Sequence, residues 1–304
     1  MRYAFVKELT KQAAKNKNIM LLTGDLGYSV FEEFRDKFPK QFINVGVAES
    51  NMMGLATGLA MSGKIVFVYS IATFSTLTAF ESIRNDIALH NAHVIIVGSG
   101  AGISYADAGA SHHAIEDIAL MRTIPNMRIL APSDPVETAW ATKTAIELKG
   151  PTYLRLGKRG EPILYAKTPN LKFGKASILK IGKDFAIIST GNIVNNAVLA
   201  VGILEKKGLK GTVISMHTLK PFDEKMIKAI CNKFKNVFTV EEHSEIGGLG
   251  SIVSDIIINM ELKSNLTKIA LPNIFIREIG TQSFLRDKYN LSPEKIAKTI
   301  FKKI

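Results

Sequence analysis

The chain has 304 residues, of which 46% are hydrophobic and 22% are charged, and this composition excludes an intrinsically disordered protein. The formal net charge of +12 comes from scattered lysines rather than from one basic helix, so we do not expect nucleic-acid binding. The single cysteine, Cys231, excludes an internal disulfide, and no apolar run suits a signal peptide or a membrane span, so we expect a cytoplasmic protein.

The first half of the chain alternates short apolar runs with helix-length amphipathic segments. The runs are continuous, which is typical of strands buried on both faces, and they lie at 19–22, 43–47, 65–69, 94–98, 127–130 and 152–156. Strand–helix alternation of this kind predicts a parallel sheet with helices on both faces.

A stretch rich in glycine, proline and lysine, residues 161–176, is predicted to be a linker. After it the alternation resumes, with predicted strands at 185–189, 211–216, 236–240 and 274–279 and predicted helices at about 193–207, 223–234, 248–261 and 291–303. We therefore expect two doubly wound α/β domains, residues 1–160 and a smaller domain of residues 177–304.

One carboxylate, Glu49, interrupts the small and apolar segment "NVGVAESNMMGLATGLA" just after a predicted strand. Ligands of open α/β sheets bind at the carboxyl ends of the strands, and a buried carboxyl there suits a ring nitrogen as a partner. The alternative is a carboxylate that caps the following helix. Gly54 and Gly58, four residues apart on that helix, would let another backbone approach closely.

Five segments, in this order, resemble the C-terminal half of transketolase and of 1-deoxyxylulose-5-phosphate synthase, and most closely the separate C-terminal subunit of split transketolases. They are "GVAESNMMGLATGLA", "DAGASHHAIEDIALMRTIPNMRILAPSD", "MHTLKPFDEKMI", "VEEHSEIGGLGS" and "GTQSFLRDKYNLSPEKIAKTI". The resemblance covers nearly the whole chain. It implies a thiamine diphosphate pyrimidine-binding domain followed by a transketolase C-terminal-type domain.

The resemblance implies a role for Glu49 as the glutamate that hydrogen-bonds a pyrimidine nitrogen of thiamine diphosphate and promotes its imino tautomer. It also implies an aromatic side chain that stacks on the pyrimidine, for which Phe74 is the first choice and Phe80 the second. Asp25 and Leu26, in "TGDLG", match family residues near the cofactor and the subunit contact, although Asp25 could equally be a turn residue.

The family pattern Gly-x-Thr-His-Gln aligns with 109–113, so the resemblance places His112 opposite the donor sugar, with His113 beside it. An imidazole there can relay protons or hydrogen-bond a developing alkoxide. Adjacent histidines point apart, so we predict no metal site at this pair. For His243, in the second domain, we prefer a structural role.

Two positions depart from the family pattern. The aspartate that reads a sugar hydroxyl is replaced by Ala108, with Asp107 beside it, and the upstream histidine or arginine of the substrate site is absent around Gly100 and Ala101. A changed substrate follows as a hypothesis, phosphorylated or nucleotide-linked. Cationic candidates for an anionic substrate group remain near the linker, namely Arg155, Lys158 and Arg159.

The diphosphate-binding segment, Gly-Asp-Gly followed by an asparagine that holds Mg²⁺, has no counterpart in the chain. We therefore expect an N-terminal transketolase-like partner subunit that carries it, and a homodimer contact that leads to a heterotetramer. The alternatives are the beta subunit of a 2-oxo acid dehydrogenase and a non-catalytic regulatory or structural subunit.

Overall fold

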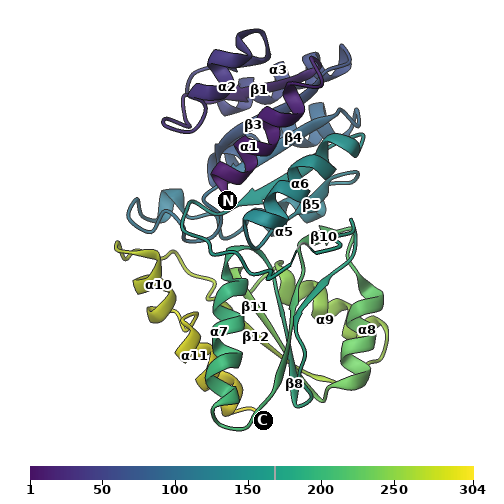
Figure 1. The fold of residues 1–304 in the computed structure, drawn as a ribbon, viewed down its shortest axis with the longest axis vertical. Helices are drawn as coiled ribbons and strands as arrows, with labels where there is room; N and C mark the ends of the chain where they lie inside the picture. The colour runs from purple at the N-terminus through teal and green to yellow at the C-terminus, as the bar shows by residue number, and fades with distance from the viewer. Residues whose placement is uncertain (168) are drawn as a thin grey trace.

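The structure is a computed structural model that describes residues 1–167 and 169–304. Thr168, which belongs to the predicted linker, lies outside the described residues. Figure 1 shows two α/β halves stacked along the long axis of the molecule, with the chain beginning in the upper half and ending at the foot of the lower half.

The sheet of the first half is parallel over the six strands that this half contributes. Its full order is β10-β5-β6-β4-β3-β1-β2. The six strands are β1 (Ile19–Thr23), β2 (Phe42–Asn44), β3 (Ile65–Ile71), β4 (Val94–Ser99), β5 (Arg128–Leu130) and β6 (Thr152–Leu156). All residues of β1, β4 and β6 are buried, as expected from their continuous apolar runs.

Helices cover both faces of this sheet and build two apolar clusters. One cluster includes Phe5 and Leu9 from the first helix and Ala141 from the sixth, and the other includes Met52 and Ile83. The helices are α1 (Arg2–Ala13), α2 (Glu32–Lys37), α3 (Glu49–Met61), α4 (Phe80–Ser82), α5 (Asp117–Thr123) and α6 (Pro135–Glu147). Short 3-10 or π helices are η1 (Pro39–Gln41), η2 (Phe74–Thr78), η3 (Ile83–Ala88) and η4 (Ala110–His112).

The second half contains a five-stranded sheet in the order β12-β11-β8-β9-β7, in which only the edge strand β7 is antiparallel to its neighbour among the described pairs. Its strands are β7 (Ser177–Lys180), β8 (Phe185–Ser189), β9 (Gly211–Ser215), β11 (Asn236–Ser244) and β12 (Asn265–Leu271). Its helices are η5 (Gly191–Ile193), α7 (Val194–Glu205), α8 (Glu224–Lys233), α9 (Leu249–Asn259), α10 (Gln282–Lys288) and α11 (Pro293–Phe301). The prediction of two α/β domains is confirmed.

Local sequence explains where several helices begin. A side-chain oxygen accepts a hydrogen bond from a backbone N–H in the first turn of α6, α8, α10 and α11, and the capping residues are Asp134, Asp223, Thr281 and Ser292. Such caps satisfy N–H groups that have no partner inside the helix. The predicted starts of α8, at about 223, and α11, at about 291, lie within two residues of the observed ones.

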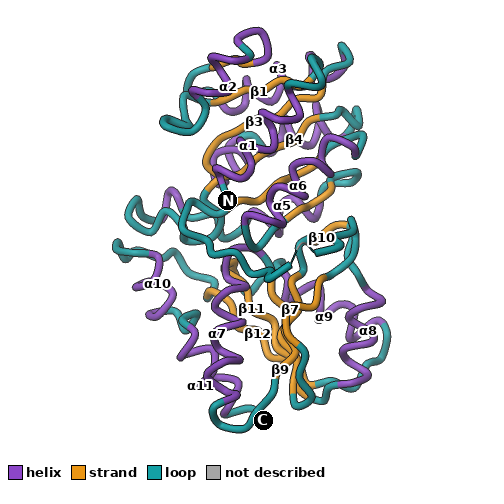
Figure 2. The backbone as a smooth tube through the Cα atoms, viewed as in Figure 1, coloured by secondary structure: helices purple, strands orange, loops and turns teal. Residues whose placement is uncertain are grey.

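The two halves are joined by more than the linker. Strand β10 (Thr218–Lys220) follows β9 in the chain but pairs antiparallel with β5, so the second half completes the sheet of the first. Figure 2 shows β10 beside the boundary between the upper and lower strands. The predicted linker is also tied to both halves, because Leu164 donates to Asp134 at 2.9 Å and Ala176 donates to Asp223 at 3.1 Å.

The prediction of a strand at 274–279 is wrong. The strand of this region is β12, and Ile274, Phe275 and Ile279 are exposed side chains, whereas Ile276 is buried. Pro272, which has no backbone N–H to donate, follows β12 directly and helps to end the ladder there.

In the described part of the chain, no helix is both long and apolar enough to cross a membrane.

Candidate active site

Glu49 lies where the sequence predicted it, at the carboxyl edge of the first sheet. It is the first residue of α3, its side chain is 7% exposed, and its carboxylate accepts a hydrogen bond of 2.8 Å from the Ser70 hydroxyl of β3. Gly24, just past β1, faces the same carboxylate, because a Cβ there would lie 3.4 Å from Oε1. The carboxylate therefore sits between the ends of two neighbouring parallel strands.

The carboxylate of Glu49 does not cap its own helix. Within the described residues, the hydrogen bond from Ser70 is the one that its side chain accepts, and Ala48 precedes α3 without a side-chain cap. The position in the first turn still favours a negative charge through the helix dipole. The geometry therefore leaves acceptor capacity on the carboxylate for a further group.

The two aromatic candidates differ in their surroundings. Phe74 begins the π helix η2 directly after the end of β3, is half-buried, and lines a cavity. Its ring meets the imidazole of His112 edge-on, with the ring centroids 5.1 Å apart. Phe80 lies in α4 and packs against the apolar core cluster of the first sheet. The structure thus gives Phe74, rather than Phe80, a face directed to a cavity.

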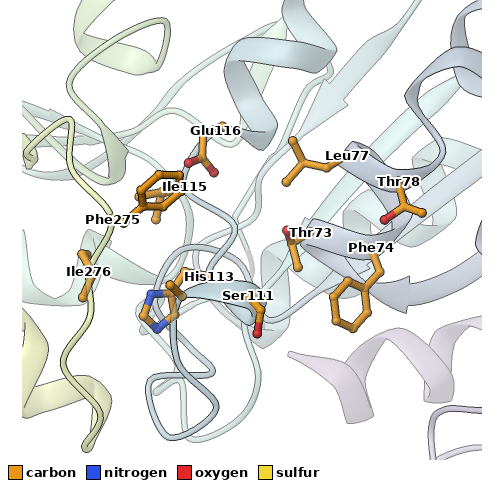
Figure 3. Close-up of a pocket in the computed structure, with 11 residues that line it drawn as sticks. Thr73, Phe74, Leu77, Thr78, Ser111, His113, Ile115, Glu116, Phe275 and Ile276 are labelled. Carbon is orange, nitrogen blue, oxygen red and sulfur yellow. The ribbon is translucent and has the colours of Figure 1, made fainter.

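This cavity, of about 300 Å³, is formed by three segments that are far apart in the chain (Figure 3). One side comes from η2 and the residue before it, the middle from residues 110–116, and the other side from Phe275 and Ile276 of the second half. Its polar lining comprises Thr73, Thr78, Ser111, His113 and Glu116. Thr73, Thr78 and Glu116 were not predicted from the sequence, because no local pattern links these segments.

His113 is the most unusual polar residue of the cavity. Its side chain is 4% exposed, and neither ring nitrogen has a hydrogen-bond partner among the residues that the structure describes. Burial lowers the pKa of His113 and raises the pKa of Glu116, because desolvation disfavours the charged form of each group. A buried imidazole with two free nitrogens has capacity for a polar ligand.

His112, Lys158 and Arg159 lie near the same edge. Nδ1 of His112 is 3.0 Å from the Ser111 hydroxyl, and its ring centroid is 6.2 Å from that of Tyr105. The Lys158 ammonium lies 4.3 Å from the centre of the Tyr105 ring and 3.1 Å from the Asp107 carboxylate. Arg159 is exposed. The structure therefore brings Lys158 and the His112 loop together through Tyr105.

Asp25 and Leu26 line a second depression, of about 180 Å³, at the same edge of the sheet. Asp25 has a φ of 56°, and its carboxylate accepts hydrogen bonds from the Asn44 amide at 2.9 Å and the Tyr28 hydroxyl at 3.2 Å. Leu26 packs against the core cluster beneath it. Asp25 adopts a turn conformation and also lies at the edge formed by the strand ends. A role as a turn residue is therefore compatible with a position near the cofactor site.

The structure contradicts the prediction that Arg155 binds an anionic substrate. Its side chain is 1% exposed and forms a buried ion pair with Asp117 at 2.7 Å. It also donates to the backbone oxygens of Ala114 at 3.2 Å and Glu242 at 3.0 Å. Burial disfavours the negative charge of the Asp117 carboxylate, but the nearby Arg155 guanidinium compensates this charge. The pKa of Asp117 is therefore lowered. Arg155 therefore joins the two halves internally.

His243 has the structural surroundings that we preferred for it. It is fully buried, its Nδ1 lies 2.8 Å from the Ser244 carbonyl, and its Nε2 lies 3.4 Å from the backbone nitrogen of Ala119. Across residues 1–167 and 169–304, no group of three or more His, Cys, Asp or Glu residues could hold a metal ion.

These features define a two-domain α/β protein with a candidate ligand site at the carboxyl edge of its first parallel sheet. The family model of the transketolase pyrimidine binding domain matches residues 1–161, and that of the transketolase C-terminal domain matches residues 174–296. The chain therefore belongs to the transketolase family, and the resemblance stated from its motifs is confirmed.

Proteins that correspond to this chain over nearly their whole length are known. A putative transketolase C-terminal section from Methanocaldococcus jannaschii is 41% identical and aligns over 100% of this chain and 96% of its own. One subunit of an apulose-4-phosphate transketolase from Phocaeicola vulgatus is 34% identical over 98% of this chain and 95% of its own. A solved structure described as a split gene transketolase, inactive beta4 tetramer, is 36% identical, has a TM-score of 0.89, and aligns over 99% of this chain and 96% of its own.

Proposed function

We propose that this chain is the pyrimidine-domain subunit of a two-chain, thiamine diphosphate-dependent transketolase-like enzyme of the cytoplasm. Such an enzyme transfers a two-carbon ketol unit between sugar-like carbonyl substrates. The observation that carries the proposal is the Glu49 carboxylate, which Ser70 holds at the strand edge and which retains acceptor capacity. Family membership supports the reaction class.

The residues around Glu49 fit the pyrimidine end of thiamine diphosphate. This cofactor, when bound, supplies a stabilised carbanion for breaking the donor's carbon–carbon bond. Glu49 would hold a proton at a pyrimidine nitrogen, and the hydrogen bond from Ser70 fixes the carboxylate for that task. Phe74 would offer a ring face, while Asp25 and Leu26 would border the site. The absence of a side chain at Gly24 leaves room beside the carboxylate.

The residues present do not fit the diphosphate and its Mg²⁺. This metal takes carboxylate, amide and phosphate oxygens, and no suitable cluster occurs among the described residues. We therefore assign the metal and the diphosphate to a partner subunit with a Gly-Asp-Gly…Asn segment. The subunit names of the relatives support a companion chain.

The exposed α3 glycines offer a surface for assembly. A Cβ at Gly54 or Gly58 would meet no atom of the described chain within 4 Å. We assign this face to the subunit contacts of an enzyme with two copies of each chain.

The division into residues 1–160, a linker at 161–176 and residues 177–304 is part of the same proposal.

The substrate is a small sugar that faces His112, His113 and the cations Lys158 and Arg159. His112 can donate to or accept from an oxygen of the donor. The ring nitrogens of His113, which have no partner within residues 1–167 and 169–304, add polar capacity in the cavity. Ala108 supplies no carboxylate for a sugar hydroxyl, which supports a substrate different from the usual pentose phosphates. The family matches disfavour a 2-oxo acid dehydrogenase, and the polar site disfavours a non-catalytic subunit.

The test is to co-express the chain with a companion chain that carries the Gly-Asp-Gly…Asn segment. We expect the complex to catalyse ketol transfer that depends on thiamine diphosphate and Mg²⁺, measured with a panel of phosphorylated and unphosphorylated ketoses. Neither chain alone should be active. A complex that assembles, binds the cofactor and transfers no ketol unit from any donor would contradict the proposal.

A further inference from the structure

The segment that carries His112 and His113 contacts the second half of the molecule as well as its own domain. It spans residues 100–113, from the residue after β4 to the residue after η4. Ile103 and Ala106, from this segment, are buried in the apolar cluster of the second domain. The second domain therefore supplies much of the surface that fixes the shape of the loop.

A buried carboxylate of the second domain, Glu242 on β11, anchors the start of this loop. Its side chain is 1% exposed, and its Oε1 accepts hydrogen bonds from the backbone N–H of Ile103 at 2.9 Å and from the Gln282 amide at 2.8 Å. Its Oε2 accepts from the Arg286 guanidinium of α10. Its backbone oxygen accepts from Arg155 of β6 at 3.0 Å. One residue thus connects the loop, α10 and the first sheet.

The backbone of the loop is shaped to meet this carboxylate. Gly102 and Ala114 exchange two backbone hydrogen bonds of 2.9 Å, which close the base of the loop. Gly102 has a φ of 63°, and a Cβ there would lie 2.5 Å from Oε1 of Glu242. A side chain at position 102 would be strained and would displace the carboxylate, so the close approach requires glycine.

Further contacts hold the loop beyond its base. The Ser104 hydroxyl accepts hydrogen bonds from the Asn192 amide at 3.0 Å and from the Gln282 amide at 3.2 Å. The backbone N–H of Gly280 donates to the Ala106 carbonyl at 3.2 Å. All three donors belong to the second domain, so this domain contacts the loop on both sides of Tyr105.

We propose that Glu242 is a positioning residue, which holds the 100–113 loop so that His112 and His113 face the substrate. The inference rests on the proposed function and gives the second domain a part in substrate recognition. Hydrogen bonds to a buried, charge-compensated carboxylate are among the strongest that a loop amide can make. Loss of this anchor would let the two imidazoles move relative to Phe74, and a displacement of about 1 Å can cost on the order of 10²-fold in rate.

The experiment compares variants of the full chain in complex with the partner subunit. Glu242→Ala removes the anchor, and the double variant Glu242→Gln with Arg286→Met keeps an acceptor for the Ile103 amide while it removes both charges. Gln282→Ala, at a half-buried side chain, provides a milder version if Glu242→Ala does not fold. Glu245→Gln, three residues along and exposed, is the matched control.

Two measurements decide the proposal. In Glu242→Ala we expect amide hydrogen exchange across residues 101–113 to rise by at least about tenfold while the central strands stay protected. We expect kcat/KM for the active ketose to fall on the order of 10²-fold at unchanged Kd for thiamine diphosphate. The double variant should restore both quantities, Gln282→Ala should shift them in the same direction, and Glu245→Gln should leave them unchanged.

Unchanged amide exchange of the loop in a folded Glu242→Ala variant would overturn the proposal. Faster loop exchange with a normal kcat/KM would also overturn it, as would a fall in kcat/KM that is matched by weaker binding of thiamine diphosphate. If the wild-type complex transfers no ketol unit, the proposed function fails. The exchange comparison then still decides whether Glu242 holds the loop.

Discussion

At the scale of single residues, the position of the Glu49 carboxylate and the space beside it depend on two neighbours that its local sequence does not reveal. Ser70 and Gly24 come from two other strand ends, and together they hold the carboxylate and leave space beside it. A glutamate in the first turn of a helix is often only a favourable charge. The hydrogen bond from Ser70 favours the functional interpretation over the capping interpretation.

The first prediction concerns Glu49→Gln. We expect activity of the assembled enzyme to fall by at least roughly 10²–10⁴-fold, because an amide cannot share the proton that the carboxyl shares with a ring nitrogen. The fold should persist, since an amide still accepts from Ser70. The measurement is hydrogen–deuterium exchange at C2 of bound thiamine diphosphate, with Glu81→Gln as an exposed control. Near-normal exchange in the variant would refute the assignment.

The second prediction concerns His112→Ala. Activity should drop by roughly a hundredfold, the usual scale for one acid–base group, while cofactor affinity changes little. Steady-state kinetics and calorimetry on the assembled enzyme separate the two effects, and His90→Ala, at an exposed histidine, is the control. A collapse of cofactor affinity with a normal rate at saturation would show that His112 serves the cofactor instead.

The third prediction concerns His217, which is fully buried between the halves with its ring 4.6 Å from that of Trp140. Burial lowers the pKa of His217 from 6.5 to about 4. Above pH 6.5 the folded and unfolded chains both hold it neutral, so it adds no pH dependence. Between 6.5 and about 4 only the unfolded chain binds the proton, so stability falls with falling pH by at most about 1.4 kcal/mol per unit.

Denaturant titrations of the chain at pH 7, 6, 5 and 4.5 test this prediction. Other groups also titrate in this range, so the informative quantity is the difference between the wild type and His217→Phe. The wild type should lose more stability than the variant as the pH falls below 6.5. Parallel pH profiles would show that His217 takes up its proton equally in both states.

At the scale of elements, continuous apolar runs located most strands, and they failed where a run was not part of a sheet. The run at 274–279 belongs to an irregular segment in which Ile276 is buried and most other side chains are exposed, and Phe275 and Ile276 line the cavity. The short strands β7 and β10 and the helix α10 had no clear periodic signal. The two strands are stabilised by pairing partners that are distant in the sequence.

The fourth prediction concerns the exposed face of α3. Gly58→Leu should stabilise the isolated chain by about 1 kcal/mol, because glycine is a poor helix former and the described chain leaves open space there. The same change should prevent assembly if this face contacts another subunit. Thermal unfolding and sedimentation measure the two effects.

The control for this prediction is Gly202→Leu in α7, where a Cβ would also meet no described atom within 4 Å. It should raise stability in the same way and leave assembly intact. Normal assembly of Gly58→Leu would exclude this face of α3 from the subunit contacts.

At the scale of the whole molecule, the proposed function makes this site one half of a cofactor site, completed by a partner subunit. The fifth prediction is that the isolated chain binds thiamine diphosphate and Mg²⁺ poorly and has no activity, because the diphosphate and the metal find no set of oxygen ligands in the described chain. Calorimetry with the isolated chain and with the two-chain complex measures the difference. Tight, Mg²⁺-dependent binding by the isolated chain would refute the division of the site between two subunits.

The sequence by itself determined the fold class, the two-domain order and the family. These depend on local apolar periodicity and on motifs in a fixed order, both of which are properties of contiguous residues. The sequence also placed Glu49, Asp25 and Phe74 after predicted strands, whose carboxyl ends share one edge of a parallel sheet. His112 was placed near the substrate only through its resemblance to the family pattern.

Only the tertiary structure decided which of these residues face a cavity and which are internal. Arg155, adjacent in sequence to plausible substrate cations, turns inward because Asp117 from another segment compensates its charge in the interior. Phe275 and Ile276 reach the cavity from the second domain, and Glu242 of that domain accepts a hydrogen bond from Ile103 of the 100–113 loop, across more than a hundred residues of chain. Such contacts depend on how the two sheets pack, and packing between distant segments leaves no periodic signal in the sequence.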